Sequence, residues 1–151
     1  MAIKENNHPI TFPFHIIKKN TSGADGVERE YNQENSILEL EKEVALGLWI
    51  QVIGQLIEVK GLTGLLKVQQ DGDTRGEEQI LTGAWIRTIG QILEAVSVSS
   101  QIKETDKIKL IQEQKIAIAG DALVSFGSGL EVIGGLRVLD EEISKPPSIV
   151  P

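Results

Sequence analysis

The chain has 151 residues, with 22 acidic and 15 basic side chains and a formal net charge of −7. It has no cysteine, which excludes disulfide scaffolds, thiol catalysis and cysteine-based zinc sites. An acidic chain without a basic tract lacks the lysines and arginines on which affinity for phosphate rests, so we expect no nucleic-acid partner. Glycine, at 15 residues, is the unusual count.

Residues 1–35 are expected to form an N-terminal arm that is partly extended. The patch at 10–17 reads ITFPFHII, and Pro9 and Pro13 disfavour a helix there. A strand, a docking arm and a loosely packed tail all fit this composition. No basic start followed by an apolar run is present, and no stretch of about 18 uncharged apolar residues follows. We therefore expect synthesis in the cytoplasm, with no signal peptide and no transmembrane segment.

Residues 36–145 are expected to form a helical repeat domain, because the sequence repeats with offsets of 36 and 37 residues. Residues 47–58 read GLWIQVIGQLIE and residues 83–94 read GAWIRTIGQILE. The more diverged third copy, at 120–131, reads GDALVSFGSGLE. Each copy is expected to be one helix, and a tail follows at 146–151.

The predicted helices span about 36–69, 75–102 and 106–143. Capping boxes at 36–39 and 74–77 introduce the first two, Thr105 or Asp106 caps the third, and Pro146 and Pro147 end it. A break of the third helix within 127–135 stays open. The predicted fold is all-α: an elongated three-helix bundle of tandem single-helix repeats.

Glycine recurs in heptad register within every predicted helix. Eight of nine equivalent positions are glycine, and Ser97 occupies the remaining one; the glycines are Gly47, Gly54, Gly61, Gly83, Gly90, Gly120, Gly127 and Gly134. Each glycine inside a helix costs about 0.8–1 kcal/mol relative to alanine, so another interaction must offset the sum. We favour close helix–helix packing over a bend at each glycine, because repeated bends would break the phase of the apolar residues.

With glycine at heptad position a, large apolar residues fill positions c, d and g and define a candidate packing face. Its residues are Trp49, Ile50, Ile53, Trp85, Ile86 and Ile89. The first helix is also apolar at position f, through Ala45, Val52, Val59 and Leu66. A helix without a polar face is expected to be covered on all sides. Three helices do not suffice for this, so the arm or a neighbouring subunit must contribute, which predicts a homo-oligomer or polymer.

No residue pattern predicts catalysis, a cofactor or a metal. His8 and His15 lack metal spacing, and the loop at 71–76 has an arginine where a calcium loop needs a third acidic ligand. The glycines at 127–135 do not follow the phosphate-loop pattern, which ends in Lys-Ser or Lys-Thr.

Glutamate also recurs at one position of each copy. Glu58, Glu94 and Glu131 lack the histidine three residues later that di-iron bundles use. They are interpreted instead as polar border residues that pair with Arg87, Lys60 or Arg137.

The unit at 83–90, GAWIRTIG, resembles the GAWIQAIG unit of uncharacterised repetitive proteins of Bacillus-type spore-forming bacteria. The resemblance covers about residues 40–140 and weakens in the third copy, where Ala122 replaces tryptophan. It implies a bacterial source and no particular chemistry. The leading prediction is therefore a non-enzymatic structural protein that self-associates, and the alternative is a membrane-associating helical protein.

Overall fold

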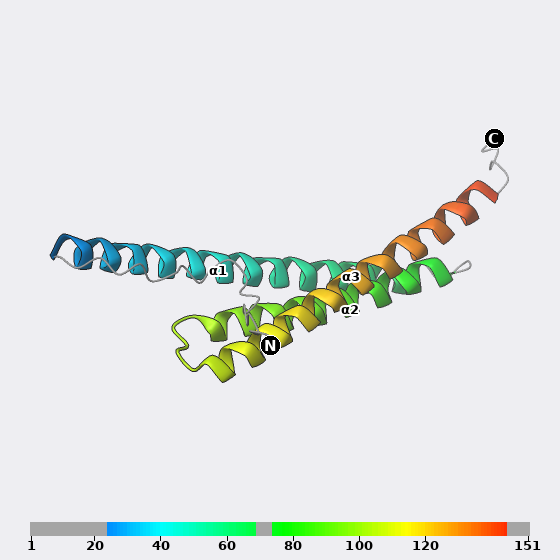
Figure 1. Ribbon diagram of the computed structural model, residues 1–151. Helices are drawn as coiled ribbons and strands as arrows, with labels where there is room; N and C mark the ends of the chain where they lie inside the picture. The colour runs from blue at the N-terminus through cyan, green and yellow to red at the C-terminus, as the bar shows by residue number, and fades with distance from the viewer. Residues whose placement is uncertain (1–23, 69–73, 145–151) are drawn as a thin grey trace, which may run out of the picture. The chain divides into compact units, whose positions relative to one another are not determined.

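The computed structural model describes residues 24–68 and 74–144, with side chains described from residue 31 onward. These residues form three helices: α1 at Ala24–Val68, α2 at Arg75–Gln101 and α3 at Lys107–Ser144 (Figure 1). The described part of the chain contains no strand, so the all-α prediction is confirmed. Met1–Asn35 and Ser36–Pro151 form two separate units, and the second unit holds the contacts between the helices.

The first helix begins at Ala24, whereas the sequence predicts its start at residue 36 and an arm over 1–35. The predicted helix start is therefore wrong, because extending an existing helix by one residue is far easier than nucleating a new one. Ser36 lies inside α1 rather than at its start. The extended patch at 10–17 and the tail at 146–151 lie outside the described residues.

The other helix ends fall within one residue of the prediction. Asp106 accepts a hydrogen bond from the backbone N–H of Ile108 at 2.8 Å and caps α3. Thr74 makes no side-chain cap bond, because its backbone (φ −105°, ψ 10°) is not in the extended conformation that capping requires. Its hydroxyl instead donates to the Glu78 carboxylate at 3.3 Å.

The central helix of the bundle is α2, which contacts both other helices. Its positions b and f face α1, and its positions a and e face α3. Leu48 and Val52 of α1 pack on Ala95 of α2, with Ile92 and Val98 at the edge of this small core. Along α3 the helix is continuous through 127–135, so no break occurs there.

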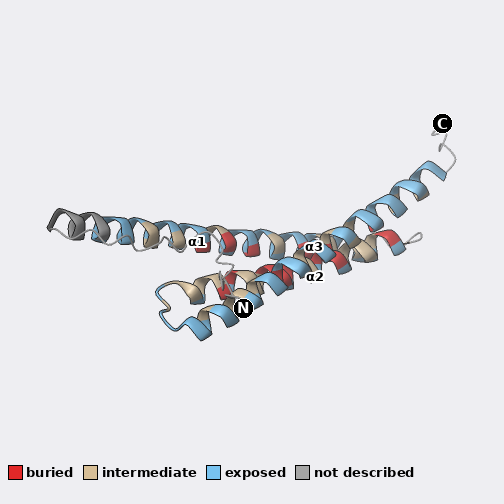
Figure 2. Cartoon of the chain, viewed as in Figure 1, coloured by how far each residue is buried: buried red, intermediate tan, exposed pale blue. Residues whose placement is uncertain are grey.

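Within the single chain, most large side chains of the predicted packing face point outward. Ile86 is half-buried, while the remaining five are between 40% and 60% exposed: Trp49, Ile50, Ile53, Trp85 and Ile89. The buried positions of α2 are held mainly by small residues (Figure 2). Close helix approach leaves room only for such residues, so the bulky ones remain on the surface.

Candidate functional site

The two helices α2 and α3 meet along a ladder of facing glycines. A Cβ on Gly83 would lie 2.6 Å from the carbonyl oxygen of Gly127, and one on Gly127 would lie 2.5 Å from that of Gly83. Gly90 and Gly120 show the same reciprocal relationship at 2.5 and 2.6 Å. No real Cβ tolerates such distances from backbone, so glycine is required at all four positions. The missing side chains permit this backbone contact, as small residues do in membrane helix pairs.

The ladder extends one heptad further at each end than the repeated sequence pattern indicates. Gly76 and Gly134 face each other, with Cβ-to-carbonyl distances of 3.0 and 2.7 Å. At the other end the Ser97 hydroxyl donates to the carbonyl oxygen of Glu113. Gly76 and Glu113 lie seven residues before Gly83 and Gly120, so continuing the heptad outward finds both. The interpretation of 74–77 as a capping box obscured Gly76.

A different face of α2 contacts α1, and at this contact equivalent residues of the first two copies lie against each other. Gln55 donates from Nε2 to Oε1 of Gln91, at 3.4 Å, and these glutamines are 36 residues apart, one repeat offset. From this contact, and because α1 and α2 run antiparallel (Figure 1), we infer an approximate twofold axis near this pair that relates the two helices. Ala84, Thr88 and Ala95 are fully buried on the α2 side, at exposures of 0–1%.

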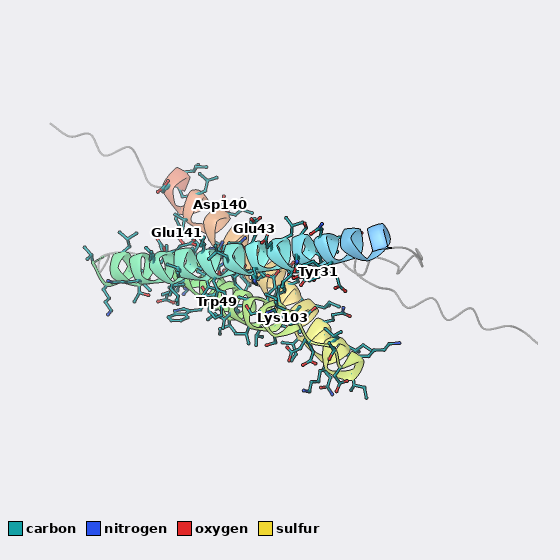
Figure 3. The ribbon with its side chains drawn as sticks, turned by 90° about the vertical axis from the view of Figure 1, so that its left-hand side faces the viewer. Tyr31, Glu43, Trp49, Lys103, Asp140 and Glu141 are labelled. Carbon is teal, nitrogen blue, oxygen red and sulfur yellow. The ribbon has the colours of Figure 1, made fainter. Side chains whose placement is uncertain are left out.

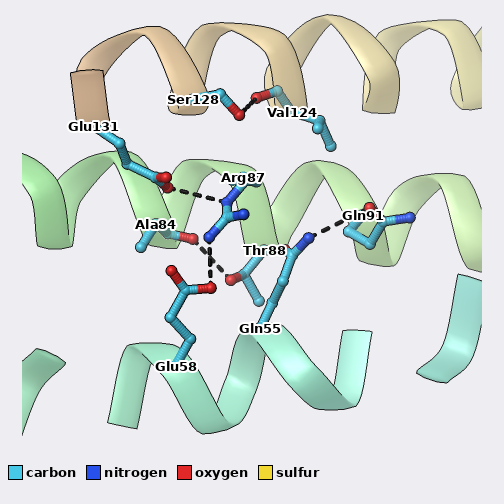
Figure 4. Close-up of polar contacts among 9 residues, drawn as sticks. All are labelled: Gln55, Glu58, Ala84, Arg87, Thr88, Gln91, Val124, Ser128 and Glu131. Atoms are coloured by element: carbon cyan, nitrogen blue, oxygen red, sulfur yellow. Dashed lines mark hydrogen bonds and ion pairs between the residues drawn. The ribbon is translucent and has the colours of Figure 1, made fainter. Parts of the chain in front are cut away.

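Arg87 links all three helices. Its Nη2 donates to Glu58 Oε2 of α1 at 2.6 Å, and its Nε forms an ion pair with Glu131 Oε1 of α3 at 3.0 Å (Figure 4). Both glutamates occupy the repeated position for which the sequence predicts pairing with a basic residue. Burial raises the pKa of Glu131, with Arg87 opposing this shift and Glu58 adding to it.

The third repeated glutamate, Glu94, lies beside an acid instead. Burial and the nearby Asp121 carboxylate raise its pKa above the ordinary value. Gln91 donates from Nε2 to Glu94 Oε2 at 2.9 Å, which favours the charged form and partly opposes the shift. The repeated glutamates therefore occupy two electrostatic environments and do not converge on one point.

The glycines of α1 are unlike those of α2 and α3. A Cβ added at Gly47, Gly54 or Gly61 would meet nothing within 4 Å. Exposed apolar side chains flank this stripe, including Ile50, Ile57 and Leu65 at 60–67% exposure. The glycine stripe of α1, which is the repeat equivalent of the buried glycines of α2, is therefore not covered by another helix in the described part of the chain.

Large apolar side chains are exposed along all three helices, and many stand clear of the backbone, as Trp49 does (Figure 3). Trp49 keeps one polar contact, from Nε1 to the Ser99 hydroxyl at 3.1 Å. Two helical stretches, Tyr31–Val68 and Lys107–Ser144, are long and apolar enough to cross a membrane. This finding rests on length and composition alone, and the expectation of no transmembrane segment stays a prediction.

Nothing in the described residues points to catalysis or a cofactor. The described part of the chain has no group of three or more His, Cys, Asp or Glu side chains placed to hold a metal ion. His8, His15 and the start of the 71–76 loop lie outside it. A groove beside the C-terminal part of α1 is lined by Leu56, Val59 and Trp85 together with two lysines, Lys60 and Lys67, and its lining contains no acid or histidine.

No protein-family model, curated protein or solved structure matches this chain. The resemblance to repetitive Bacillus-type proteins stays a prediction. What the chain does must be inferred from its own surfaces.

Proposed function

We propose that the chain is a non-enzymatic structural protein that associates with copies of itself into a higher-order assembly. The observation that carries this proposal is the outward-facing apolar stripe at positions c, d and g. Singly scattered apolar residues are normal on a surface, but contiguous apolar patches mark interaction sites. Here the stripe continues through successive heptads of α1 and α2, from Trp49 to Ile89.

The packing inside the chain supports the same proposal. The interior is built mainly from alanine, glycine, serine and threonine, whereas most leucines, isoleucines and tryptophans remain outside. Burial of large apolar side chains stabilises a fold by about 1.5–3 kcal/mol each. Association would supply burial that the single chain lacks.

Light scattering of the purified protein at tens of micromolar tests this proposal. We expect a mass of two chains or more that falls on dilution. A strict monomer at that concentration would overturn it. Electron microscopy of the same sample separates discrete particles from filaments.

A second candidate function, association with a membrane, is favoured by one specific observation. The apolar windows in Tyr31–Val68 and Lys107–Ser144 are only 28% and 11% buried within the chain. Small residues at heptad spacing also suit helix association in lipid. The overall acidity argues against attraction to anionic headgroups, so self-association in water is preferred.

Liposome flotation separates the two candidates. Co-flotation with neutral vesicles, together with a rise in helix content, would favour the membrane. Sedimentation of the protein away from both neutral and anionic vesicles would eliminate it. Light scattering of the unbound fraction then reports the assembly itself.

A further inference from the structure

The α2–α3 ladder shows what the glycine face of this repeat accepts. The glycine face of α2 packs against the glycine face of α3, which is another copy of the repeat and runs antiparallel to it. Gly83 lies opposite Gly127, and Gly90 lies opposite Gly120. In each pair the first glycine of one copy meets the second glycine of the other. The glycine face of one copy is thus complementary to the glycine face of another, and the contact between a first and a second glycine occurs twice along the α2–α3 pair.

The same face is present on α1 without an occupant. Gly47 and Gly54 are the repeat equivalents of Gly83 and Gly90, and open space surrounds them. The approximate twofold axis near Gln55 and Gln91 exchanges α1 with α2. It therefore carries α3, seated on α2, onto the open face of α1, so this face is accessible and correctly placed for a helix.

We propose that the α1 helix of a second copy of this chain occupies that face, antiparallel, with Gly47 of each copy opposite Gly54 of the other. This inference rests on the proposed self-association and names its partner, its face and its register. The resulting interface is isologous, as is common for dimers. In it, α1 of the second copy would lie on α1 as α3 lies on α2.

Charge favours this register over the one with Gly54 opposite Gly54. In the ladder, the residues four positions after facing glycines also face each other, as Arg87 and Glu131 do at 3.0 Å. With Gly47 opposite Gly54, Gln51 of one copy faces Glu58 of the other, and an amide can donate to a carboxylate. With Gly54 opposite Gly54, two Glu58 carboxylates would face each other and repel.

The ends of the interface are apolar in the proposed register. Val44 of each copy would face Leu65 of the other, the counterparts of Ile80 and Val138, which flank Gly76 and Gly134. Val44 and Leu65 are 46% and 65% exposed in the single chain. Leu40 stands where α2 has Gly76, so the closest backbone approach is confined to the two central glycine pairs.

Because the chain has no cysteine, single introduced cysteines report the register directly. Gln51 lies next to the proposed twofold axis. Its equivalents, Arg87 and Val124, lie between the two central glycine crossings, Arg87 against Gly127 and Val124 against Gly90. Gln51→Cys should therefore form a disulfide-linked dimer under mild oxidation. Leu65→Cys, on the same face but far from the axis, should not link to itself.

A mixture of Val44→Cys and Leu65→Cys chains provides the positive control for Leu65, since the register predicts a cross-linked heterodimer. Light scattering of the reduced variants reports association independently of the disulfide, and circular dichroism checks that each variant folds. Gln51→Cys dimers together with an unlinked Leu65→Cys are the expected result.

Three other outcomes would overturn the inference. Self-linking of both Gln51→Cys and Leu65→Cys would indicate a parallel α1 pair. Association without any of these cross-links would place the contact on another face, which removes this interface but leaves the proposed function standing. A monomer by light scattering, with no cross-links, would remove both.

Discussion

Gly83 and Gly127 lie backbone against backbone, each leaving no room for a Cβ beside the carbonyl oxygen of the other. This reciprocal contact explains why the sequence retains glycine inside long helices at a cost of about 1 kcal/mol each. The backbone contact and the packing around it must offset that cost.

Substitution of Gly83 by alanine should destabilise the chain, because the new methyl group would lie 2.6 Å from the Gly127 carbonyl oxygen. We expect a net loss of about 1–2 kcal/mol, the overpacking penalty less the gain in helix propensity. Gly54→Ala is the matched control, since its methyl group would meet open space.

Urea unfolding followed by circular dichroism measures both variants at a concentration low enough for a monomer. Gly54→Ala should be as stable as the wild type or more stable, by up to about 1 kcal/mol. Equal losses in both variants would show that the ladder has no special role.

Replacement of Arg87 by glutamine should loosen all three helices, because one guanidinium serves both Glu58 and Glu131. We expect a loss of about 1–2 kcal/mol, since a half-buried carboxylate is left without its partner. The Glu58→Gln and Arg87→Gln double variant completes a thermodynamic cycle. Strictly additive losses in thermal unfolding would argue against a coupled pair.

Glu94→Gln should stabilise the chain at neutral pH and not in acid. The pKa of Glu94 is raised, so its ionisation opposes folding. The stability of the protonated form is present below the ordinary value of 4.5 and is lost as pH rises through the raised value.

The expected gain from Glu94→Gln at neutral pH is on the order of 0.5 kcal/mol, because solvent screens this partly exposed group. The glutamine can still accept the bond from Gln91, so the network is otherwise kept. Thermal unfolding of both proteins across the acid range checks this. A gain that persists unchanged at low pH would assign the effect to packing rather than to charge.

Asp106→Ala should destabilise the turn between α2 and α3 by about 1 kcal/mol, because its carboxylate caps the Ile108 amide at 2.8 Å. Asp106→Asn is the control, since asparagine caps about as well. Amide hydrogen exchange should show faster exchange in the first turn of α3 for the alanine variant alone. Equal protection in both variants would mean that the cap is dispensable.

The sequence was sufficient to predict the helix ends near 101 and 107 and the heptad glycines, because caps and spacing are local signals. It misplaced the start of α1, since no local residue stops a helix from extending through 24–35. It also did not show which face of α2 is buried within the chain. Hydrophobicity identified Ile50 and Ile89 as apolar, but not which side of the helix meets another helix in the same chain.

The interior was difficult to predict for a physical reason. Ala84, Thr88 and Ala95 carry little hydrophobic signal, yet they are buried because only small side chains fit between helices this close. The recurring glutamate predicted a basic partner, with Arg87 as one of three candidates, but not that Arg87 would contact two glutamates. Gly76 was missed although it continues the same heptad.

Sedimentation velocity of the wild type and of a Gly47→Leu, Gly54→Leu variant tests the central claim most directly. Open space surrounds both glycines in the single chain, so the variant should fold with unchanged helix content. The wild type should sediment as an associating species, and the variant should shift towards the monomer. Identical sedimentation of two equally helical proteins would contradict assembly through the α1 glycine face.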